Sequence, residues 1–189
     1  ETKYAPTRYH WLRRLCGGHD DPKRPVWPGK INEVLYLLET ELKGESVVIW
    51  FSYNQEVHAV SQSLRNITHG ILTGENTQEF RAGVVADFQR KKFQVLLAQQ
   101  AVAQTGMNLS VSDTAIYYST PLGAVARIQT EDRIVDISRR SPHLIIDLVV
   151  PGTGDEDAVD GAQGKIKRGQ WTLERAKELI ALWKIQYPE

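Results

Sequence analysis

Five short apolar runs, separated by helix-like stretches, constrain the fold of this chain more than any other feature. They occupy residues 46–51, 67–72, 93–98, 114–118 and 144–150. Each is rich in β-branched, aromatic or other apolar side chains, as strands covered on both faces are. Between the runs, apolar residues recur at helical spacing, as do Ile31, Val34, Leu35, Leu38 and Leu42. The alternation predicts an α/β fold with a parallel sheet of five or six strands and helices on both faces.

The segments outside this alternation carry weaker signals. Residues 1–29 hold four of the eight prolines, so we expect an irregular lead-in segment with one helical turn near Tyr9–Leu15. A short helix is expected within 153–167, packed near residues 129–133, and a C-terminal helical extension over 168–189. The chain thus divides into a lead-in over 1–29, a lobe over 30–167 and a C-terminal helix.

The composition is typical of a globular protein. The chain has 23 Lys and Arg against 23 Asp and Glu, which argues against a polybasic binder but leaves room for a local basic stripe. Its single cysteine, Cys16, indicates a reducing compartment. No apolar run approaches the roughly 20 residues that span a bilayer, and the first residues show no leader pattern. We therefore expect a monomeric chain without a membrane partner.

Motifs that would bind nucleotide or metal within this chain are missing. Neither Gly29-Lys30 nor Gly164-Lys165 has the glycine and the Ser or Thr of a phosphate-binding P-loop. The run Asp155-Glu156-Asp157 resembles an acidic Mg²⁺ box, but a solvated helix N-terminus explains it better. Cys16 with two nearby histidines is too few ligands for structural zinc. We expect no metal site, and no ATP site within this chain alone.

The strongest pattern follows the third apolar run. That run ends in Gln99-Gln100, then Gly106-Met107-Asn108-Leu109 follows, and Gln129-x-x-Asp132-Arg133 comes after the next run. In order and spacing these residues resemble motifs five and six of the C-terminal RecA-like lobe of superfamily-two helicases and translocases, in the Swi/Snf-type or phage helicase branch. Upstream, residues 47–53 resemble motif four, and Leu72-Thr73-Gly74 resembles the block that follows it. The resemblance covers about residues 10–167.

The resemblance implies a RecA-like fold and a role in ATP hydrolysis. ATP and Mg²⁺ would bind between this lobe and an N-terminal RecA-like lobe of the same polypeptide. Arg133 matches the first arginine of motif six and Gln129 its glutamine, so these are the candidate catalytic residues. Gly106 and Asn108 match motif five and, with Arg133, are the candidates for nucleotide binding. Cations of a second lobe act where charge develops on the γ-phosphate.

Candidate nucleic-acid contacts lie at or just after strand ends, the edge where ligands bind in open α/β sheets. They are Ser52, Tyr53, Thr73, Gly74, Gln99 and Gln100. The sequence therefore predicts the second motor lobe of an ATP-dependent helicase or translocase that is inactive alone. DNA is the expected partner, with RNA left open, and the expected setting is the cytoplasm of a bacterial or phage-infected cell.

Two departures from the family pattern leave alternatives open. Asp136 stands where the family has its arginine finger, with Arg139 or Arg140 as substitutes, and Gln104 replaces a glycine that supplies backbone freedom. Asp136 favours a second hypothesis, a non-catalytic nucleic-acid or protein-binding module derived from a motor lobe. A third, an unrelated α/β enzyme such as a nucleotide-sugar transferase, lacks the phosphate loop it needs. Asn108 alternatively caps a turn, and Arg133 alternatively is a solvated charge.

Overall fold

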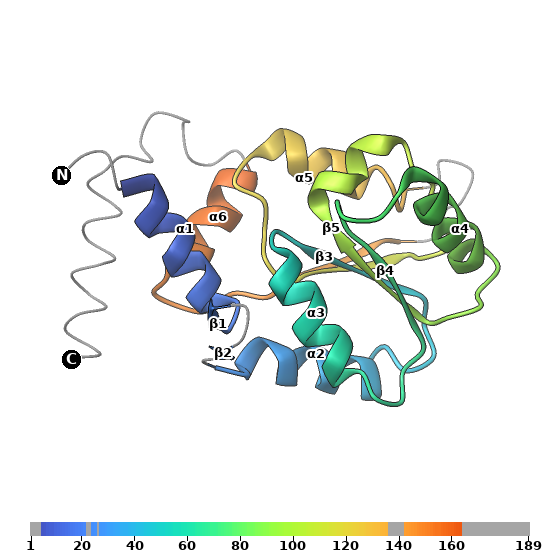
Figure 1. Cartoon of the computed structure of the whole chain (residues 1–189), viewed down its shortest axis with the longest axis horizontal. Coiled ribbons are helices and arrows are strands. Elements are labelled where there is room, and N and C mark those ends of the chain that lie inside the picture. The colour runs from blue at the N-terminus through green and yellow to red at the C-terminus, as the bar shows by residue number, and fades with distance from the viewer. Residues whose placement is uncertain (1–4, 22–23, 26, 136–141, 164–189) are drawn as a thin grey trace.

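A five-stranded sheet forms the centre of the molecule (Figure 1). The computed structural model describes residues 5–21, 24–25, 27–135 and 142–163. The strands are β3 (Val47–Phe51), β4 (His69–Leu72), β5 (Val95–Gln99), β6 (Thr114–Tyr117) and β7 (Leu144–Asp147). Their order is β4-β5-β3-β6-β7, and every neighbouring pair is parallel. The predicted parallel sheet is confirmed with five strands.

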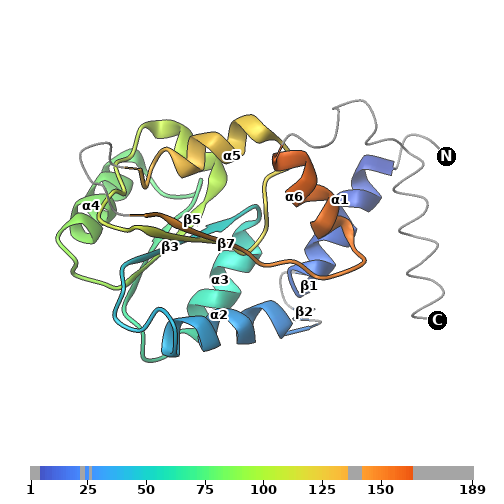
Figure 2. The ribbon, with the colours of Figure 1, turned by 180° about the vertical axis from the view of Figure 1, so that it is seen from behind.

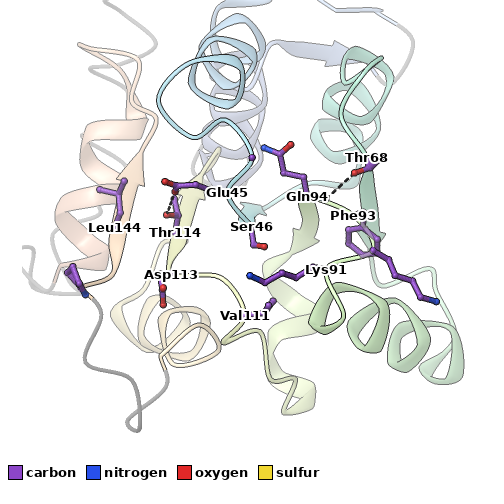
Figure 3. Close-up of a pocket in the computed structure, with 13 residues that line it drawn as sticks. Glu45, Ser46, Thr68, Lys91, Phe93, Gln94, Val111, Asp113, Thr114 and Leu144 are labelled. Carbon is purple, nitrogen blue, oxygen red and sulfur yellow. Dashed lines mark hydrogen bonds between the residues drawn. The ribbon is translucent and has the colours of Figure 1, made fainter.

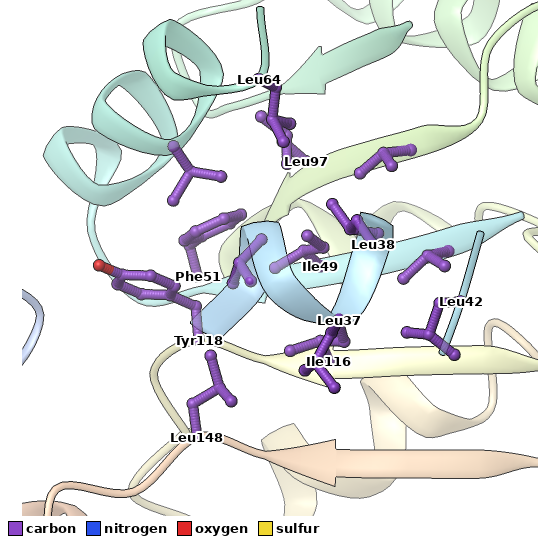
Figure 4. Packing of buried hydrophobic residues seen from close by; sticks show 14 of the residues in the cluster. Leu37, Leu38, Leu42, Ile49, Phe51, Leu64, Leu97, Ile116, Tyr118 and Leu148 are labelled. Atoms are coloured by element: carbon purple, nitrogen blue, oxygen red, sulfur yellow. The ribbon is translucent and has the colours of Figure 1, made fainter. Parts of the chain in front are cut away.

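Helices cover both faces of this sheet. They are α2 (Gly29–Glu39), α3 (Asn54–Ser63), α4 (Gln78–Gln89), the 3₁₀ helix η2 (Gln100–Thr105) and α5 (Ala124–Glu131), while α6 (Gly154–Ala162) packs on α5. Helices α2 and α3 share one core with Ile49 and Phe51 (Figure 4). Helix α4 shares the other core with Val48 and Trp50. Because successive residues of β3 enter different cores, the strand is apolar throughout, and all five of its residues are buried.

A side-chain cap fixes the start of helix α4. Its N-cap is Thr77, whose hydroxyl accepts a hydrogen bond from the Phe80 N–H at 3.2 Å. The Asn76 side chain instead accepts a bond from the Thr73 N–H at 2.7 Å, which fixes the turn after β4. Asn76 thus organises a turn of the candidate site rather than the helix end.

The lead-in segment is more regular than predicted. The helical turn expected near Tyr9–Leu15 lies within a longer helix, α1 (Ala5–Cys16), which is followed by a small antiparallel pair, β1 (His19–Asp21) with β2 (Arg24–Pro25). The proline of α1 lies in its first turn, where no intrahelical N–H is lost. Tyr9, Leu12 and Cys16 are buried at helical spacing, so α1 does have an apolar face.

Helix α1 packs beside α6 at the end of the molecule where β6 and β7 finish (Figure 2). The Tyr9 hydroxyl donates to the Gly154 carbonyl at 3.2 Å, and the Tyr118 hydroxyl donates to the Gly17 carbonyl at 2.9 Å. Gly18, which follows, has φ +86°, a left-handed conformation that glycine adopts without strain. Residues far apart in sequence thereby fix α1 on the lobe.

The short helix predicted within 153–167 is confirmed as α6, which packs on α5 as expected. Its N-cap is Thr153, whose hydroxyl accepts from the Asp155 N–H at 3.2 Å. The predicted C-terminal helix over 168–189 lies outside the described residues. No helix of the described residues is both long and apolar enough to cross a bilayer.

Candidate nucleic-acid interface and nucleotide-facing residues

Three strands that end side by side place polar side chains at the carboxyl edge of the sheet. Ser52 follows β3, Gln100 follows β5 and Ser119 follows β6. The Ser52 N–H donates to the Ser119 hydroxyl at 2.7 Å, and the Gln100 amide donates to the Ser119 carbonyl. The Ser52 hydroxyl donates to the side-chain amide oxygen of Gln100, Oε1, at 3.4 Å. The structure therefore brings predicted residues from two segments together around a serine that the sequence reasoning missed.

The turn after β4 joins the same edge through β5. The Gly74 N–H donates to the Gln99 side-chain oxygen at 3.0 Å. The Arg81 guanidinium of α4 donates to the carbonyls of Asn76 and Gly74, so it holds the turn in place. Gly74 is exposed, whereas Thr73 is 2% exposed. In this arrangement Gly74 presents a surface to a ligand, and the Thr73 side chain does not.

A buried carboxylate lies directly beneath Ser52 and Tyr53. Glu56, in the first turn of α3, is 1% exposed and accepts bonds from the Ser119 hydroxyl at 2.7 Å and the Tyr53 N–H at 3.3 Å. Burial raises the pKa of Glu56, and its bond from Ser119 and the charges of Lys30 and Arg13 lower it by less. Glu56 thus ties the first turn of α3 to the end of β6.

The nucleotide-binding candidates form a second group beside α5. Gly106 follows η2 with φ +73° and is exposed, so the glycine gives the left-handed conformation this turn requires. The Asn108 side chain accepts from the Ser110 N–H at 2.9 Å, which is the turn-capping role left open by the sequence. The next N–H, of Leu109, donates to the Arg133 carbonyl at 2.8 Å. Motif five and the end of motif six are therefore in direct contact.

Arg133 lies two residues beyond the last residue of α5, not within a helix. The residue is half-buried, and its buried Nε has no hydrogen-bond partner among the described residues. An orphaned guanidinium N–H fits a phosphate oxygen, so the residue suits the nucleotide role that the resemblance implies. Gln129 is half-buried on α5. Asp136, Arg139 and Arg140 lie outside the described residues.

The backbone at Gln104 does not require the conformational freedom of the glycine that the family has at this position. It lies within the 3₁₀ helix η2. Among the described residues other than glycine, Lys91 is the one with a positive φ. The replacement of the family's glycine therefore costs no left-handed strain here.

Two residues of the candidate region, Ser119 and His10, were not predicted from the sequence. Ser119 follows β6 as Ser52 follows β3, so the rule that found Ser52 would also have found Ser119. His10 of α1 reaches the Tyr53 hydroxyl at 3.1 Å, and both rings meet edge to face. Nothing in the local sequence indicates that contact, because 43 positions separate the two residues.

A hollow of about 710 Å³ opens at the opposite edge of the sheet, where the strands begin (Figure 3). Ser46 precedes β3, Thr68 precedes β4 and Leu144 begins β7, and all three line it. None of the predicted site residues lines it. The hollow and the carboxyl-edge network are therefore separate features.

Comparisons with known proteins agree with the predicted fold. The family model described as the helicase conserved C-terminal domain matches residues 29–138. The crystal structure of the C-terminal part of the Fun30 ATPase domain superposes with a TM-score of 0.68 at 17% identity, covering 93% of this chain and 63% of that one. The Hef helicase domain of Pyrococcus furiosus superposes with a TM-score of 0.55 at 20% identity, covering 71% of this chain and 28% of that one. The predicted RecA-like fold is confirmed.

Sequence relatives include chromatin-remodeling ATPases named INO80. The protein from Saccharomyces cerevisiae is 28% identical over 148 residues, covering 77% of this chain and 10% of that protein. The one from Kluyveromyces lactis is 29% identical over 154 residues, covering 79% and 10%. The chain thus spans about a tenth of the length of these relatives. They are fungal, so the expected bacterial or phage setting finds no support. Because the family model matches more than half of its residues, the chain belongs to the helicase conserved C-terminal domain family.

Proposed function

We propose that this chain is the second motor lobe of an ATP-dependent nucleic-acid helicase or translocase. The observation that carries the proposal is the convergence of Ser52, Gln99, Gln100 and Gly74 at one sheet edge. These residues come from three separate predicted motifs, and they meet at the edge where open α/β sheets bind ligands. The relatives' names, which include the word ATPase, support the same class of activity.

In this proposal the lobe contributes part of a nucleic-acid track. The exposed Gly74 turn and the Ser52–Gln100 pair offer neutral hydrogen-bonding groups at the edge where α/β sheets bind ligands. Neutral donors suit the phosphodiester backbone, which carries no sequence information. We expect DNA to be the substrate, bound with little sequence preference.

In this proposal the lobe also contributes side chains to the site of ATP hydrolysis. Arg133 would meet the γ-phosphate, and Gln129 would lie beside it on α5. ATP supplies the reactive phosphoryl group, and Mg²⁺ neutralises its charge. The Mg²⁺ ligands and the phosphate loop would come from an N-terminal lobe of the same polypeptide. Within the described part of the chain, no three His, Cys, Asp or Glu side chains cluster to hold a metal ion.

A second candidate function rests on Asp136. A carboxylate at the position of the family's arginine finger would repel a γ-phosphate, which favours a binding module that has lost hydrolysis. Both candidates use the carboxyl edge for nucleic acid, and they differ in whether ATP is turned over.

Binding to nucleic acid tests what the two candidates share. Fluorescence anisotropy with a labelled 20-nucleotide single strand and its duplex should give dissociation constants of about 10⁻⁴–10⁻⁶ M for this chain. The affinity should fall as salt rises and should change little with sequence. No binding to either probe at low salt, or tight binding to one sequence alone, would contradict the proposal.

A further inference from the structure

Helix α1 lies outside the matched family domain, which begins at residue 29, yet it reaches the candidate interface. His10 is exposed on α1, and its Nδ1 lies 3.1 Å from the Tyr53 hydroxyl. Tyr53 follows the carboxyl end of β3 next to Ser52. The two rings are perpendicular, with centroids 6.4 Å apart. A residue from the lead-in segment thus lies at the surface beside a predicted nucleic-acid contact.

The contact is held by a rigid frame and not by two exposed side chains alone. One residue before His10, the Tyr9 hydroxyl bonds to the Gly154 carbonyl. Three residues after it, the buried Arg13 guanidinium donates to the Thr120 carbonyl at the end of β6. Because both neighbours on α1 are anchored to the lobe, His10 has a fixed position relative to β3. Fixed donors lose little entropy when they bind a ligand.

The chemistry of the pair leaves at least one proton donor unused. If the Tyr53 O–H donates to Nδ1 of neutral His10, the other ring nitrogen carries the proton and its N–H is free. If instead Nδ1–H donates to the Tyr53 oxygen, the phenol O–H is free. If His10 is charged, both donors are free. Each arrangement therefore offers an N–H or O–H to an acceptor outside the protein.

An unused donor at this position suits an oxygen acceptor. Burial raises the pKa of Tyr53, so the phenol keeps its proton at neutral pH; Arg13 and Arg14 lower that pKa, whereas Glu56 and Asp155 raise it. The two arginines belong to the last turn of α1. A fixed N–H or O–H donor matches the phosphodiester oxygens of a nucleic-acid backbone, which accept such bonds from side chains.

We propose that His10 and Tyr53 form one binding unit for a phosphodiester group, so that α1 extends the nucleic-acid interface beyond the family domain. The inference rests on the proposed function, because it takes the carboxyl edge as the nucleic-acid track. The unit acts through hydrogen bonds to the backbone, so it contributes affinity without sequence preference.

Four variants of the 189-residue chain test the unit by anisotropy with the labelled 20-nucleotide strand. His10→Phe keeps an aromatic ring and loses both nitrogens, and Tyr53→Phe loses the hydroxyl alone. Each should weaken binding about threefold to tenfold, as loss of a hydrogen bond to a charged group does. The double variant should be little weaker than either single one, because the two side chains act as a unit. Lys43→Ala, which removes an exposed charge from the turn after α2, is the matched control and should bind like the wild type.

The conservative variant His10→Gln separates binding from packing. Its amide retains a donor and an acceptor, so it should recover most of the affinity that His10→Phe loses. Equal binding by wild type, His10→Phe and Tyr53→Phe would overturn the inference while leaving the proposed function standing. Failure of the wild-type chain to bind either probe would instead overturn the proposed function itself. Thermal melting of every variant checks that the lobe remains folded.

Discussion

Lys30 and Asp155 form an ion pair of 2.6 Å with both side chains only 4% exposed. Lys30 also donates to the Tyr118 carbonyl at 2.8 Å, and the Asp155 carboxylate accepts from the Val150 N–H at 3.2 Å. The pair joins the second residue of α2 to the second residue of α6, across 125 positions of the sequence. The interpretation of Asp155 as part of a solvated helix N-terminus was therefore wrong, although Glu156 beside it is exposed.

Breaking this pair from one side should destabilise the lobe strongly. Asp155→Asn leaves the Lys30 ammonium buried without its counter-charge, so the free energy of unfolding should fall by about 3–5 kcal/mol. Chemical denaturation followed by tryptophan fluorescence measures the loss. Glu156→Gln in the same helical turn is the control, and should change stability by less than about 0.5 kcal/mol. Equal effects of the two substitutions would show that the pair contributes nothing particular.

Replacing both partners should restore part of the stability. A Lys30→Met, Asp155→Leu double variant removes both buried charges together, and such exchanges are often close to neutral. Its unfolding free energy should therefore exceed that of Asp155→Asn. A double variant less stable than the single one would mean that the hydrogen bonds to Tyr118 and Val150, not the ion pair, are the main contribution.

Glu56 should give the lobe a distinctive pH dependence. Its pKa is raised in the folded state because the carboxyl is buried, and Lys30 and Arg13 offset this only in part. Its stabilising contribution is thus fully present below its ordinary pKa of 4.5 and is lost as pH rises through the folded pKa. Above pH 4.5, wild-type stability should fall relative to Glu56→Gln by about 1.4 kcal/mol per pH unit until the folded pKa is reached.

Paired denaturation curves of wild type and Glu56→Gln between pH 4.5 and 7.5 check the sign. Groups common to both proteins cancel in the difference, which isolates position 56. A difference that stays constant over this range would show that Glu56 is ionised in the folded lobe throughout, and a difference that grows in favour of the wild type would reverse the sign.

The chain alone should hydrolyse no ATP above background. It has no P-loop to hold the β- and γ-phosphates, and the proposal takes the Mg²⁺ ligands from another lobe. A coupled-enzyme assay over a range of ATP concentrations measures this. Turnover that saturates with ATP and scales with protein concentration would contradict it.

Asp136→Arg distinguishes a motor from a binding module when it is tested in a polypeptide that joins this chain to the proposed N-terminal lobe. If position 136 faces the γ-phosphate, a cation there should raise ATP hydrolysis, because arginine fingers contribute about 10³–10⁵ in rate where measured. Stimulation by DNA is measured for wild type and variant side by side. An unchanged or lower rate would place the finger elsewhere, with Arg139 or Arg140 as the next candidates.

The fold was predictable because its signals are local. Strands β3 and β5 are apolar at every position that enters either core, and α2 carries a continuous apolar stripe. Helix α1 was predicted only as a single turn, because the four prolines of residues 1–29 favour irregular structure and its buried face is short, consisting of Tyr9, Leu12 and Cys16. The order of the motifs likewise predicted which residues follow strand ends. Long-range contacts, such as that of His10 with Tyr53, could not be predicted from any local pattern.

Burial at the candidate site was equally hard to predict. Thr73 and Gly74 are adjacent in sequence, but the turn fixed by Asn76 buries the first and exposes the second. Asp155 and Glu156 differ in the same way because α2 brings Lys30 to one and not the other. Such differences depend on tertiary contacts, whereas sequence periodicity reports only which face of an element is apolar.

The nucleotide role of Arg133 is tested by the rate of DNA-stimulated ATP hydrolysis, measured with Arg133→Ala in a polypeptide that joins this chain to the proposed N-terminal lobe. Arg133 is half-buried, with an unpartnered Nε among the described residues, so the substitution should leave melting unchanged while it removes the cation proposed to meet the γ-phosphate. Arg90→Ala is the control, since the side chain of this exposed arginine makes one ion pair among the described residues, with Asp87 at 3.9 Å. We expect Arg133→Ala to abolish the stimulated rate and Arg90→Ala to preserve it. A stimulated rate that survives Arg133→Ala in a folded protein would contradict the assignment of motif six and, with it, the nucleotide role of this lobe.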